Sequence, residues 1–326
     1  AIKILNGALA IKLSVQSTDE SVMKNMKRDN ISSDQMLALV PAIRESNLPS
    51  VTEIIVGLPG DSFATNIKTI KDMMRVDVDQ YLVYTLMLLH GSELATPEER
   101  KKWGFNTKFR ILPRSFAELK SGKKIMEVEE VVVSSNSLSF DEYVKIRLLA
   151  FSIFVTNQTS YKPIIKFLRQ NNVDIFDLFN RPLDDNNLPE NIQDVFEKFK
   201  KSTVNELWDS PEEIIENFQD DDQYQKLISE HIGFNVIQFH QALVTTNHMP
   251  EWTEYIIKLA QTLLDENNVP QEKYLEPFNE ISNYCRGLTY NALELDSNLS
   301  NPEFLFKYDI EKWTLDSHDQ TIDKFE

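Results

Sequence analysis

Short apolar runs alternate with helical patterns over the first 89 residues, and this order restricts the fold more than any other feature. The apolar runs lie at residues 10–16, 51–56 and 81–89. The segments between them, 36–43 and 63–74, repeat apolar residues at helical spacing. This order is typical of parallel βαβ units, whose helices pack outside the sheet. The sequence therefore predicts an α/β fold with a parallel sheet.

The C-terminal ends of those strands are where a ligand is expected. In parallel α/β sheets, ligands bind in the crevice beyond the carboxyl ends of the strands. This rule directs attention to the polar groups at or just after Gln16, Val56 and Tyr84.

Helical signals dominate the second half of the chain. A hydroxyl residue followed three positions later by Glu or Gln is typical of a helix start. Such pairs are Ser32 and Gln35, Ser139 and Glu142, and Ser210 and Glu213. We predict an α/β domain over residues 1–138 and a mostly α-helical domain over 139–326. Residues 92–124 are expected to be irregular, 125–133 a further strand, and 304–308 a strand near the end.

Composition narrows the range of partners. The chain carries 34 basic and 51 acidic residues, a net charge of −17, which repels nucleic acid and anionic lipid. It has no apolar run long enough to span a bilayer, and its first residues do not resemble a signal peptide. We therefore expect a cytoplasmic protein that binds neither nucleic acid nor a membrane.

The residue spacing indicates neither a metal site nor the active site of a serine hydrolase. The five histidines have no metal-ligand spacing, and Ser14 and Ser17 lack the glycines of a nucleophile elbow. The single cysteine, Cys285, cannot hold an iron–sulfur cluster and is interpreted as a buried packing residue. No residue is assigned as catalytic or as a metal ligand.

Three short segments could belong to a ligand site, and each has a plain structural alternative. The turn at residues 57–61, which begins with Gly57, precedes a helix and is either a ligand loop or a structural turn. Glu53 is an acid in an apolar strand, which is costly unless it is paired or functional, although a surface position would also explain it. Arg28 lies in a charge cluster that would ordinarily be a solvated turn.

Taken together, residues 13–17, 27–30 and 53–61 resemble the fourth and fifth strand motifs of radical S-adenosylmethionine enzymes. The order and spacing carry the resemblance, because Arg28 follows Gln16 by 12 positions and Glu53 follows it by 37. The fold implied is a partial (β/α) barrel of about strands four to six, followed by the helical domain.

The resemblance implies a role for several residues. Gln16 would contact S-adenosylmethionine, Arg28 would meet its methionine carboxylate, and Glu53 would hold the ribose hydroxyls. A guanidinium suits a carboxylate, and a carboxylate can accept from two neighbouring hydroxyls. The family commonly has aspartate where this chain has Glu53. The remaining cofactor-binding residues implied are Ser14, Gly57, Leu86 and Met87, the last two at a strand end beside the adenine.

Later segments, at residues 91–100, 107–110 and 127–133, resemble a subgroup with a cobalamin-binding domain. The family holds a [4Fe–4S] cluster with three closely spaced cysteines, which this chain lacks. The chain is therefore expected to be a C-terminal fragment, inactive alone, of an enzyme that cleaves S-adenosylmethionine reductively.

For that enzyme the resemblance implies a reductant such as flavodoxin or ferredoxin, and a small-molecule or peptide substrate that the sequence does not identify. Two other functions fit the same residues. One is a helical protein-interaction module, and the other is an S-adenosylmethionine-binding protein without radical chemistry, on a degenerate barrel half.

Overall fold

The computed structural model describes residues 11–28, 35–36, 38–39, 42, 48–229, 232–290, 303–316 and 318–326. The predicted helix start at Ser32 lies outside them, as does half of the segment 36–43 with the predicted helical pattern.

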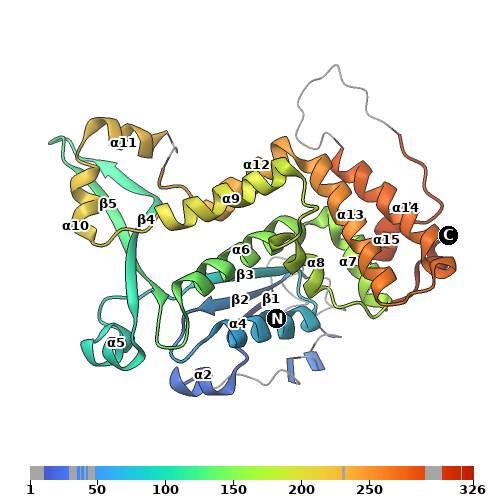
Figure 1. Ribbon diagram of the computed structural model, residues 1–326, viewed down its shortest axis with the longest axis horizontal. Coiled ribbons are helices and arrows are strands. Elements are labelled where there is room, and N and C mark those ends of the chain that lie inside the picture. Colours follow the sequence, from blue (N-terminus) through green and yellow to red (C-terminus); the bar gives the residue numbers. More distant parts are fainter. Residues whose placement is uncertain are drawn as a thin grey trace.

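Three parallel strands form the sheet that the apolar runs predicted (Figure 1). They are β1 (Ile11–Gln16), β2 (Ser50–Val56) and β3 (Gln80–Thr85), in the order β1-β2-β3. The pairing of β2 with β3 is regular, whereas β1 shifts register against β2 near its C-terminal end. The α/β class is therefore confirmed, and the structure contains a small parallel sheet.

Helices cover one face of this sheet. α4 (Phe63–Val76) packs on β2, and α6 (Phe140–Thr156) packs on β3 and α4. Both begin at capping boxes, formed by Ser62 with Thr65 and by Ser139 with Glu142. The box at Ser139 was predicted from the sequence.

Side chains alternate between the two faces along each strand. Val15, Ile54 and Val83 are buried in the core with α4 and α6, whereas Ser14 and Tyr84 are exposed. Since neighbouring residues of a strand point to opposite faces, the exposed residues lie on the face away from these helices.

Residues 92–124 are ordered, contrary to the prediction of an irregular segment. They contain α5 (Pro97–Trp103) and most of the long hairpin of β4 (Asn106–Glu118) and β5 (Lys124–Ser134). β4 contains charged residues that interrupt the apolar alternation expected of a strand. These charges are tolerated because their ion-pair partners lie on the opposing strand or further along the chain. Arg110, for example, pairs with Glu129 of β5 and with Glu206.

The rest of the chain is mainly helical, as predicted. The short α2 (Glu20–Asn25) lies between β1 and β2. After α6 follow α7 (Lys162–Gln170), α8 (Phe176–Asn180), α9 (Glu190–Asn205), α10 (Pro211–Asn217), α11 (Asp221–Ile228), α12 (Val236–Asn247), α13 (Met249–Glu266), α14 (Gln271–Thr289) and α15 (Ile310–Leu315). Short 3₁₀ helices occupy Glu93–Ala95, Thr159–Tyr161, Arg181–Leu183 and Ile322–Phe325.

The strand predicted at 304–308 is wrong. None of the described strands pairs with this segment. Phe306 and Tyr308 pack against the core whereas Leu305 is 99% exposed, so the side chains alternate between buried and exposed without a sheet.

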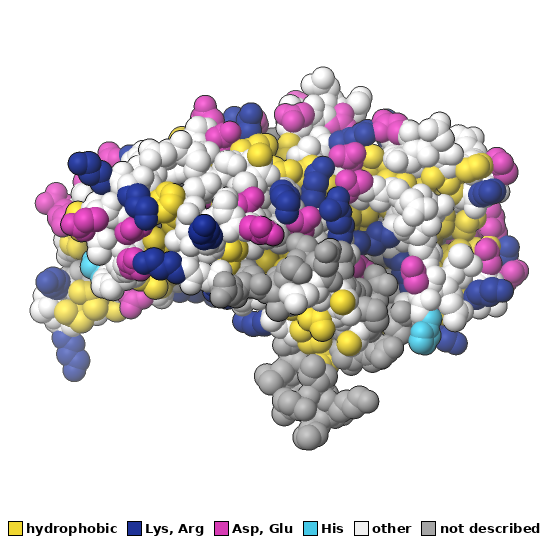
Figure 2. Space-filling view, turned by 90° about the horizontal axis from the view of Figure 1, so that it is seen from below, with side chains coloured by type: hydrophobic (Ala, Val, Ile, Leu, Met, Phe, Trp, Pro, Cys, Tyr) yellow, Lys and Arg dark blue, Asp and Glu magenta, His cyan; other side chains and the backbone are white. Residues whose placement is uncertain are grey.

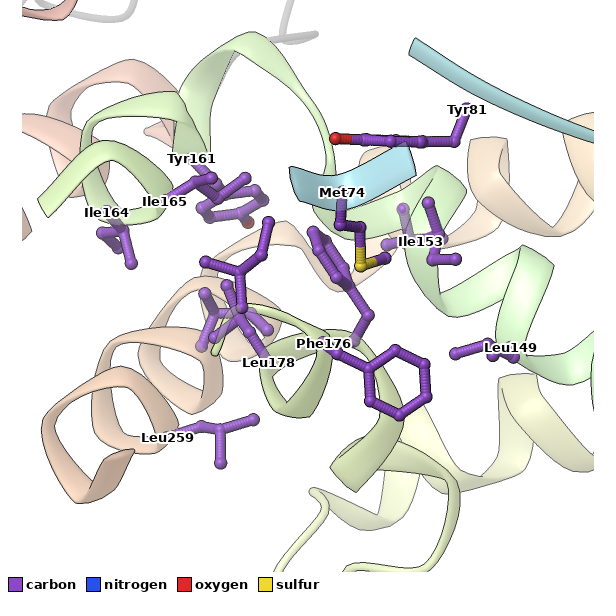
Figure 3. Packing of buried hydrophobic residues seen from close by; sticks show 14 of the residues in the cluster. Met74, Tyr81, Leu149, Ile153, Tyr161, Ile164, Ile165, Phe176, Leu178 and Leu259 are labelled. Atoms are coloured by element: carbon purple, nitrogen blue, oxygen red, sulfur yellow. The ribbon is translucent and has the colours of Figure 1, made fainter. Parts of the chain in front are cut away.

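One hydrophobic core joins the sheet to the helices. Figure 3 shows Met74 of α4 and Tyr81 of β3 near Ile153 of α6 and Phe176 of α8. The same core includes Phe278 of α14. The domain boundary at 138/139 stays a prediction, since the apolar packing is continuous across it.

On one face of the molecule, acidic and basic side chains are mixed (Figure 2). Figure 2 shows basic and acidic side chains interspersed among hydrophobic ones on the face seen from below. Within the part of the chain that the structure describes, none of the helices combines the length and apolar character needed to cross a membrane.

Candidate functional site

Three of the predicted site residues meet on the exposed face of the sheet. The Ser14 hydroxyl donates to Glu53 Oε2 at 2.8 Å, and Arg28 Nη2 donates to the Ser14 carbonyl oxygen at 3.2 Å. The strand register explains the first contact, because Leu13 lies opposite Thr52 and so sets Ser14 beside Glu53.

Glu53 keeps one carboxylate oxygen available. Lys12 Nζ forms an ion pair with Glu53 Oε1 at 3.8 Å, a distance too long for a hydrogen bond. Tyr84 lies on the same face. Partial burial raises its pKa, and the negative charge of Glu53 raises that pKa further. The surface thus combines a carboxylate, two hydroxyls and a guanidinium.

Gln16 ends β1 in an unusual conformation. Its φ of 62° is in the left-handed region, at the point where β1 shifts register against β2. Its side-chain oxygen Oε1 is buried and has no hydrogen-bond partner among the described residues. A buried amide oxygen without a donor costs free energy, so this atom is suited to accept a hydrogen bond from a ligand.

A specific helix end positions Arg28. α2 ends in a Schellman motif, in which Lys27 is left-handed with φ 53° and the Arg28 amide donates to the Met23 carbonyl at 3.1 Å. Lys27 also forms an ion pair with Glu93, and this contact raises the Lys27 pKa. The backbone therefore fixes Arg28, although its side chain is exposed.

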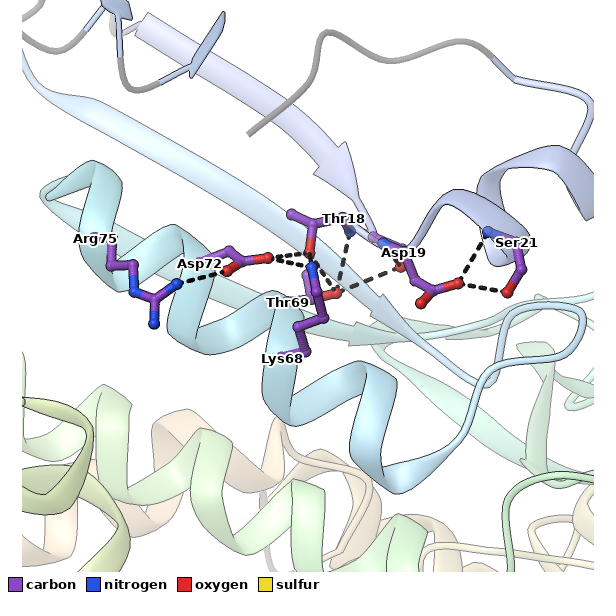
Figure 4. Close-up of polar contacts among 8 residues, drawn as sticks. Thr18, Asp19, Ser21, Lys68, Thr69, Asp72 and Arg75 are labelled. Atoms are coloured by element: carbon purple, nitrogen blue, oxygen red, sulfur yellow. Dashed lines mark hydrogen bonds and ion pairs between the residues drawn. The ribbon is translucent and has the colours of Figure 1, made fainter. Parts of the chain in front are cut away.

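The start of α2 is tied to α4. Figure 4 shows Thr18 beside Thr69 and Asp72, with the Thr18 hydroxyl donating to Asp72 Oδ2 at 2.7 Å. Asp19 caps α2 by accepting from the amides of Ser21 and Val22, and hydrogen bonds at this cap lower its pKa. The loop after β1 is thus held to the helix that covers the sheet.

The turn that begins at Gly57 satisfies its own polar groups. The Gly57 amide donates to Asp61 Oδ2 at 3.2 Å, and Asp61 also accepts from Ser62, Thr65 and Asn66. Burial raises the pKa of Asp61 to about 6, against the opposing effect of these donors. This geometry supports the structural reading of the turn, whereas a cofactor contact by Gly57 stays a prediction.

Leu86 and Met87 are outside the contacts around Glu53. The Leu86 amide donates to Val56 and its carbonyl accepts from Val132, both at 2.9 Å. The Leu86 side chain is buried, whereas Met87 is 43% exposed. Both backbone groups of Leu86 are therefore already used, so a contact between that backbone and the adenine would have to replace or share an existing bond.

Sequence reasoning pointed to the strand end at Tyr84 but assigned that residue no cofactor contact, and it did not single out Lys12. For Lys12 the signal was present, because residues 12 and 14 share one face of a strand. The place of Tyr84 follows from the strand register, in which Ile55, two residues after Glu53, lies opposite Tyr84. Asn25 was also missed. Its side-chain amide donates to the Pro59 carbonyl at 3.0 Å and links α2 to the turn.

Cys285 has the packing role that its solitary occurrence predicted. It lies fully buried in α14, and burial raises its thiol pKa to about 12. Among the described residues, no group of three or more His, Cys, Asp or Glu side chains is arranged to hold a metal ion.

Comparison with known proteins gives two similar methyltransferases. The cobalamin-dependent radical SAM methyltransferase TokK of Streptomyces tokunonensis is 29% identical over 136 residues, which is 41% of this chain. The 2-(S-pantetheinyl)-carbapenam-3-carboxylate methyltransferase of Streptantibioticus cattleyicolor is 29% identical over 135 residues, which is 40% of this chain. No protein-family model matches the chain.

The matched region spans 19% of the length of each of these relatives. This similarity supports a distant relationship to radical S-adenosylmethionine enzymes at the level of the superfamily.

Proposed function

We propose that this chain supplies part of the S-adenosylmethionine site of a radical S-adenosylmethionine enzyme. The observation that carries the proposal is the convergence of Ser14, Arg28 and Glu53, next to a buried Gln16 oxygen that lacks a donor. The relationship to a radical SAM methyltransferase supports the same assignment.

The residues present fit the chemical groups of this cofactor. Arg28 would pair with the carboxylate of the methionine part, and Glu53 would accept from the ribose hydroxyls through the oxygen that Ser14 leaves available. Gln16 Oε1 would accept from an N–H group of the cofactor. Ser14 would act as a positioning residue, since it orients Glu53 and its carbonyl holds Arg28.

The iron–sulfur cluster does not fit the residues of this chain. When bound in such enzymes, the cluster supplies the electron that cleaves S-adenosylmethionine. Cys285 is the single cysteine, and its burial and raised pKa oppose thiolate ligation. The cluster, cobalamin and the methyl-transfer or other radical reaction are thus proposals about the whole protein, and the substrate and the reductant belong with them.

Calorimetric titration of the complete natural protein with S-adenosylmethionine tests the cofactor site. A charged hydrogen bond contributes about 1.5–3 kcal/mol, so Arg28→Ala is expected to weaken binding by about tenfold or more. Glu53→Ala is expected to weaken it as well. Arg75→Ala is the matched control, because Arg75 is an exposed arginine that pairs locally with Asp72 on α4. Equal affinities for the wild type and Arg28→Ala would contradict the proposal.

A second candidate is an S-adenosylmethionine-binding protein without radical chemistry, which the same contacts of Arg28 and Glu53 would serve. Anaerobic cluster reconstitution of the complete protein, followed by an assay for 5′-deoxyadenosine, separates the two functions. Product formation supports the radical enzyme, whereas cofactor binding without product supports the second candidate.

A further inference from the structure

A cleft of about 770 Å³ lies between β3 and the helical part of the chain, apart from the contacts around Glu53. Gln80, Leu82 and Tyr84 line it from the strand. Gln238 and Gln241 of α12 line it from the helices, together with residues of α14 and α15. Tyr84 belongs both to this cleft and to the candidate cofactor site, because the negative charge of Glu53 raises the Tyr84 pKa.

β3 presents its edge to this cleft. Consecutive strand residues point to opposite faces, yet both Tyr81 and Leu82 line the cleft, so the strand lies side-on to it. Among the described strands, β3 pairs along its length only with β2, on its other side. A strand edge without a partner offers backbone N–H and C=O groups for pairing with another strand.

The start of this edge is already capped. The Asp79 carbonyl accepts from Asn157 Nδ2 at 2.8 Å and from Lys162 Nζ at 3.0 Å. Lys162 also donates to Asn157 Oδ1, and burial lowers the Lys162 pKa. These side chains satisfy the first carbonyl beside the strand and define one end of the cleft, beyond which the edge runs on through β3.

Three glutamine side chains that line the cleft, one on β3 and two on α12, suit peptide groups. Gln80, Gln238 and Gln241 have no side-chain hydrogen bonds to other described residues, and a glutamine amide both donates and accepts, as a peptide bond does. Exposed Leu288 and Leu315 add apolar surface for the side chains of a ligand.

Charge within the cleft selects against an acidic ligand. Asp79 and Lys162 line the cleft with charges of opposite sign. This leaves Glu311 as an exposed lining charge without a side-chain hydrogen bond or ion pair to a described residue. The whole chain is also strongly acidic.

We propose that this cleft binds an extended peptide segment, neutral or basic in charge, which adds as a strand to the free edge of β3. Hydrogen bonds between the two main chains would provide affinity, and the glutamines and leucines would contact alternate side chains of the peptide and so provide specificity. The proposal rests on the cleft and the strand edge and is independent of cofactor binding.

Selection from a pool of short labelled peptides, with Val, Thr and Lys varied at alternate positions, tests this inference on the full chain. The selected peptide is then titrated by fluorescence polarisation. Leu315→Arg places a bulky cation at the lining and is expected to weaken binding by about tenfold or more. Leu305→Arg is the matched control, because Leu305 is 99% exposed and does not line the cleft.

Hydrogen exchange supplies the second readout. Bound peptide is expected to slow amide exchange within residues 80–85, since those backbone groups would gain partners. Failure to select any peptide, equal binding to both leucine variants, or binding without slower exchange in β3 would overturn the proposal. Arg28→Ala is expected to leave peptide affinity unchanged, so failure of the cofactor proposal would be recognised separately.

Discussion

The polar groups at the end of β2 are satisfied by hydrogen bonds within their own turn, whereas a buried polar atom at the end of β1 is not. At the end of β2, Asp61 is buried and accepts from both backbone and side-chain donors of its own turn. At the end of β1, Gln16 Oε1 is buried without a donor among the described residues. Beside it, Glu53 of β2 and Arg28 after α2 stay solvent-accessible. Internal satisfaction is typical of a structural element, whereas unsatisfied groups are typical of a ligand site. We therefore expect changes at Asp61 to affect folding, and changes at Arg28 or Glu53 to affect binding.

Removal of the Asp61 carboxylate is the largest expected effect on stability. Asp61→Ala leaves several buried donors without an acceptor and is expected to reduce the free energy of unfolding by about 3 kcal/mol. Urea unfolding followed by circular dichroism measures the loss. Glu53→Ala should lose less than about 1 kcal/mol, since its carboxylate is partly exposed. A greater loss of unfolding free energy for Glu53→Ala than for Asp61→Ala would contradict the assignment of Asp61 to folding and of Glu53 to binding.

The pH dependence of stability gives a smaller effect at the same residue. Burial raises the folded-state pKa of Asp61 to about 6, above its usual value of 3.8, so the folded state binds the proton more tightly. This group therefore stabilises the fold at low pH, and the contribution is lost as pH rises through about 4 to 6. Relative to Asp61→Asn, the wild type should gain roughly 2 kcal/mol between pH 7 and pH 4. If the difference in unfolding free energy between wild type and Asp61→Asn does not change with pH, the four donors cancel the effect of burial on the Asp61 pKa.

Gly60 tests the shape of the turn. Its φ is +81°, and a Cβ there would lie 2.7 Å from Asn25 Nδ2, which bonds to the Pro59 carbonyl. Gly60→Ala is expected to cost about 1–2 kcal/mol, because L-residues are strained in this conformation and the added Cβ would displace the Asn25 amide. Thermal unfolding measures it. Gly122→Ala is the matched control, since Gly122 has a similar φ of +79° but open space around its Cβ position. Equal losses would show that strain alone, without contact with α2, accounts for the cost.

The smallest expected effect is on Tyr84. Burial is the larger cause of its raised pKa and the Glu53 charge the smaller one. Glu53→Gln should therefore lower the Tyr84 pKa slightly and leave it above the usual value. NMR titration of labelled tyrosine, with Glu98→Gln as a control on the exposed surface of α5, measures the change. An unchanged Tyr84 pKa would show that Glu53 and Tyr84 do not interact.

The sequence predicted the parts of the fold that burial determines. The three strands and α4 carry apolar residues in periodic patterns, so they could be located in advance. The helix α2 could not, because it is short and depends on the Asp19 cap and the left-handed Lys27. β4 was missed because its charged residues are paired across the hairpin.

The candidate site was predictable as a set of residues but not as a surface. The spacing of Gln16, Arg28 and Glu53 suggested that the three residues belong to one cofactor site, and the family resemblance supplied the role of each. The contact of Ser14 with Glu53 and the position of Tyr84 depend on strand register, which spacing alone does not reveal. The unpartnered Gln16 oxygen depends on burial by distant parts of the chain.

A structure of the complete natural protein with bound S-adenosylhomocysteine tests the central claim most directly. We predict that the ligand carboxylate lies against Arg28, that its ribose hydroxyls contact Glu53, and that Gln16 Oε1 gains a donor. A ligand bound elsewhere, with Gln16 Oε1 still lacking a donor, would contradict the account.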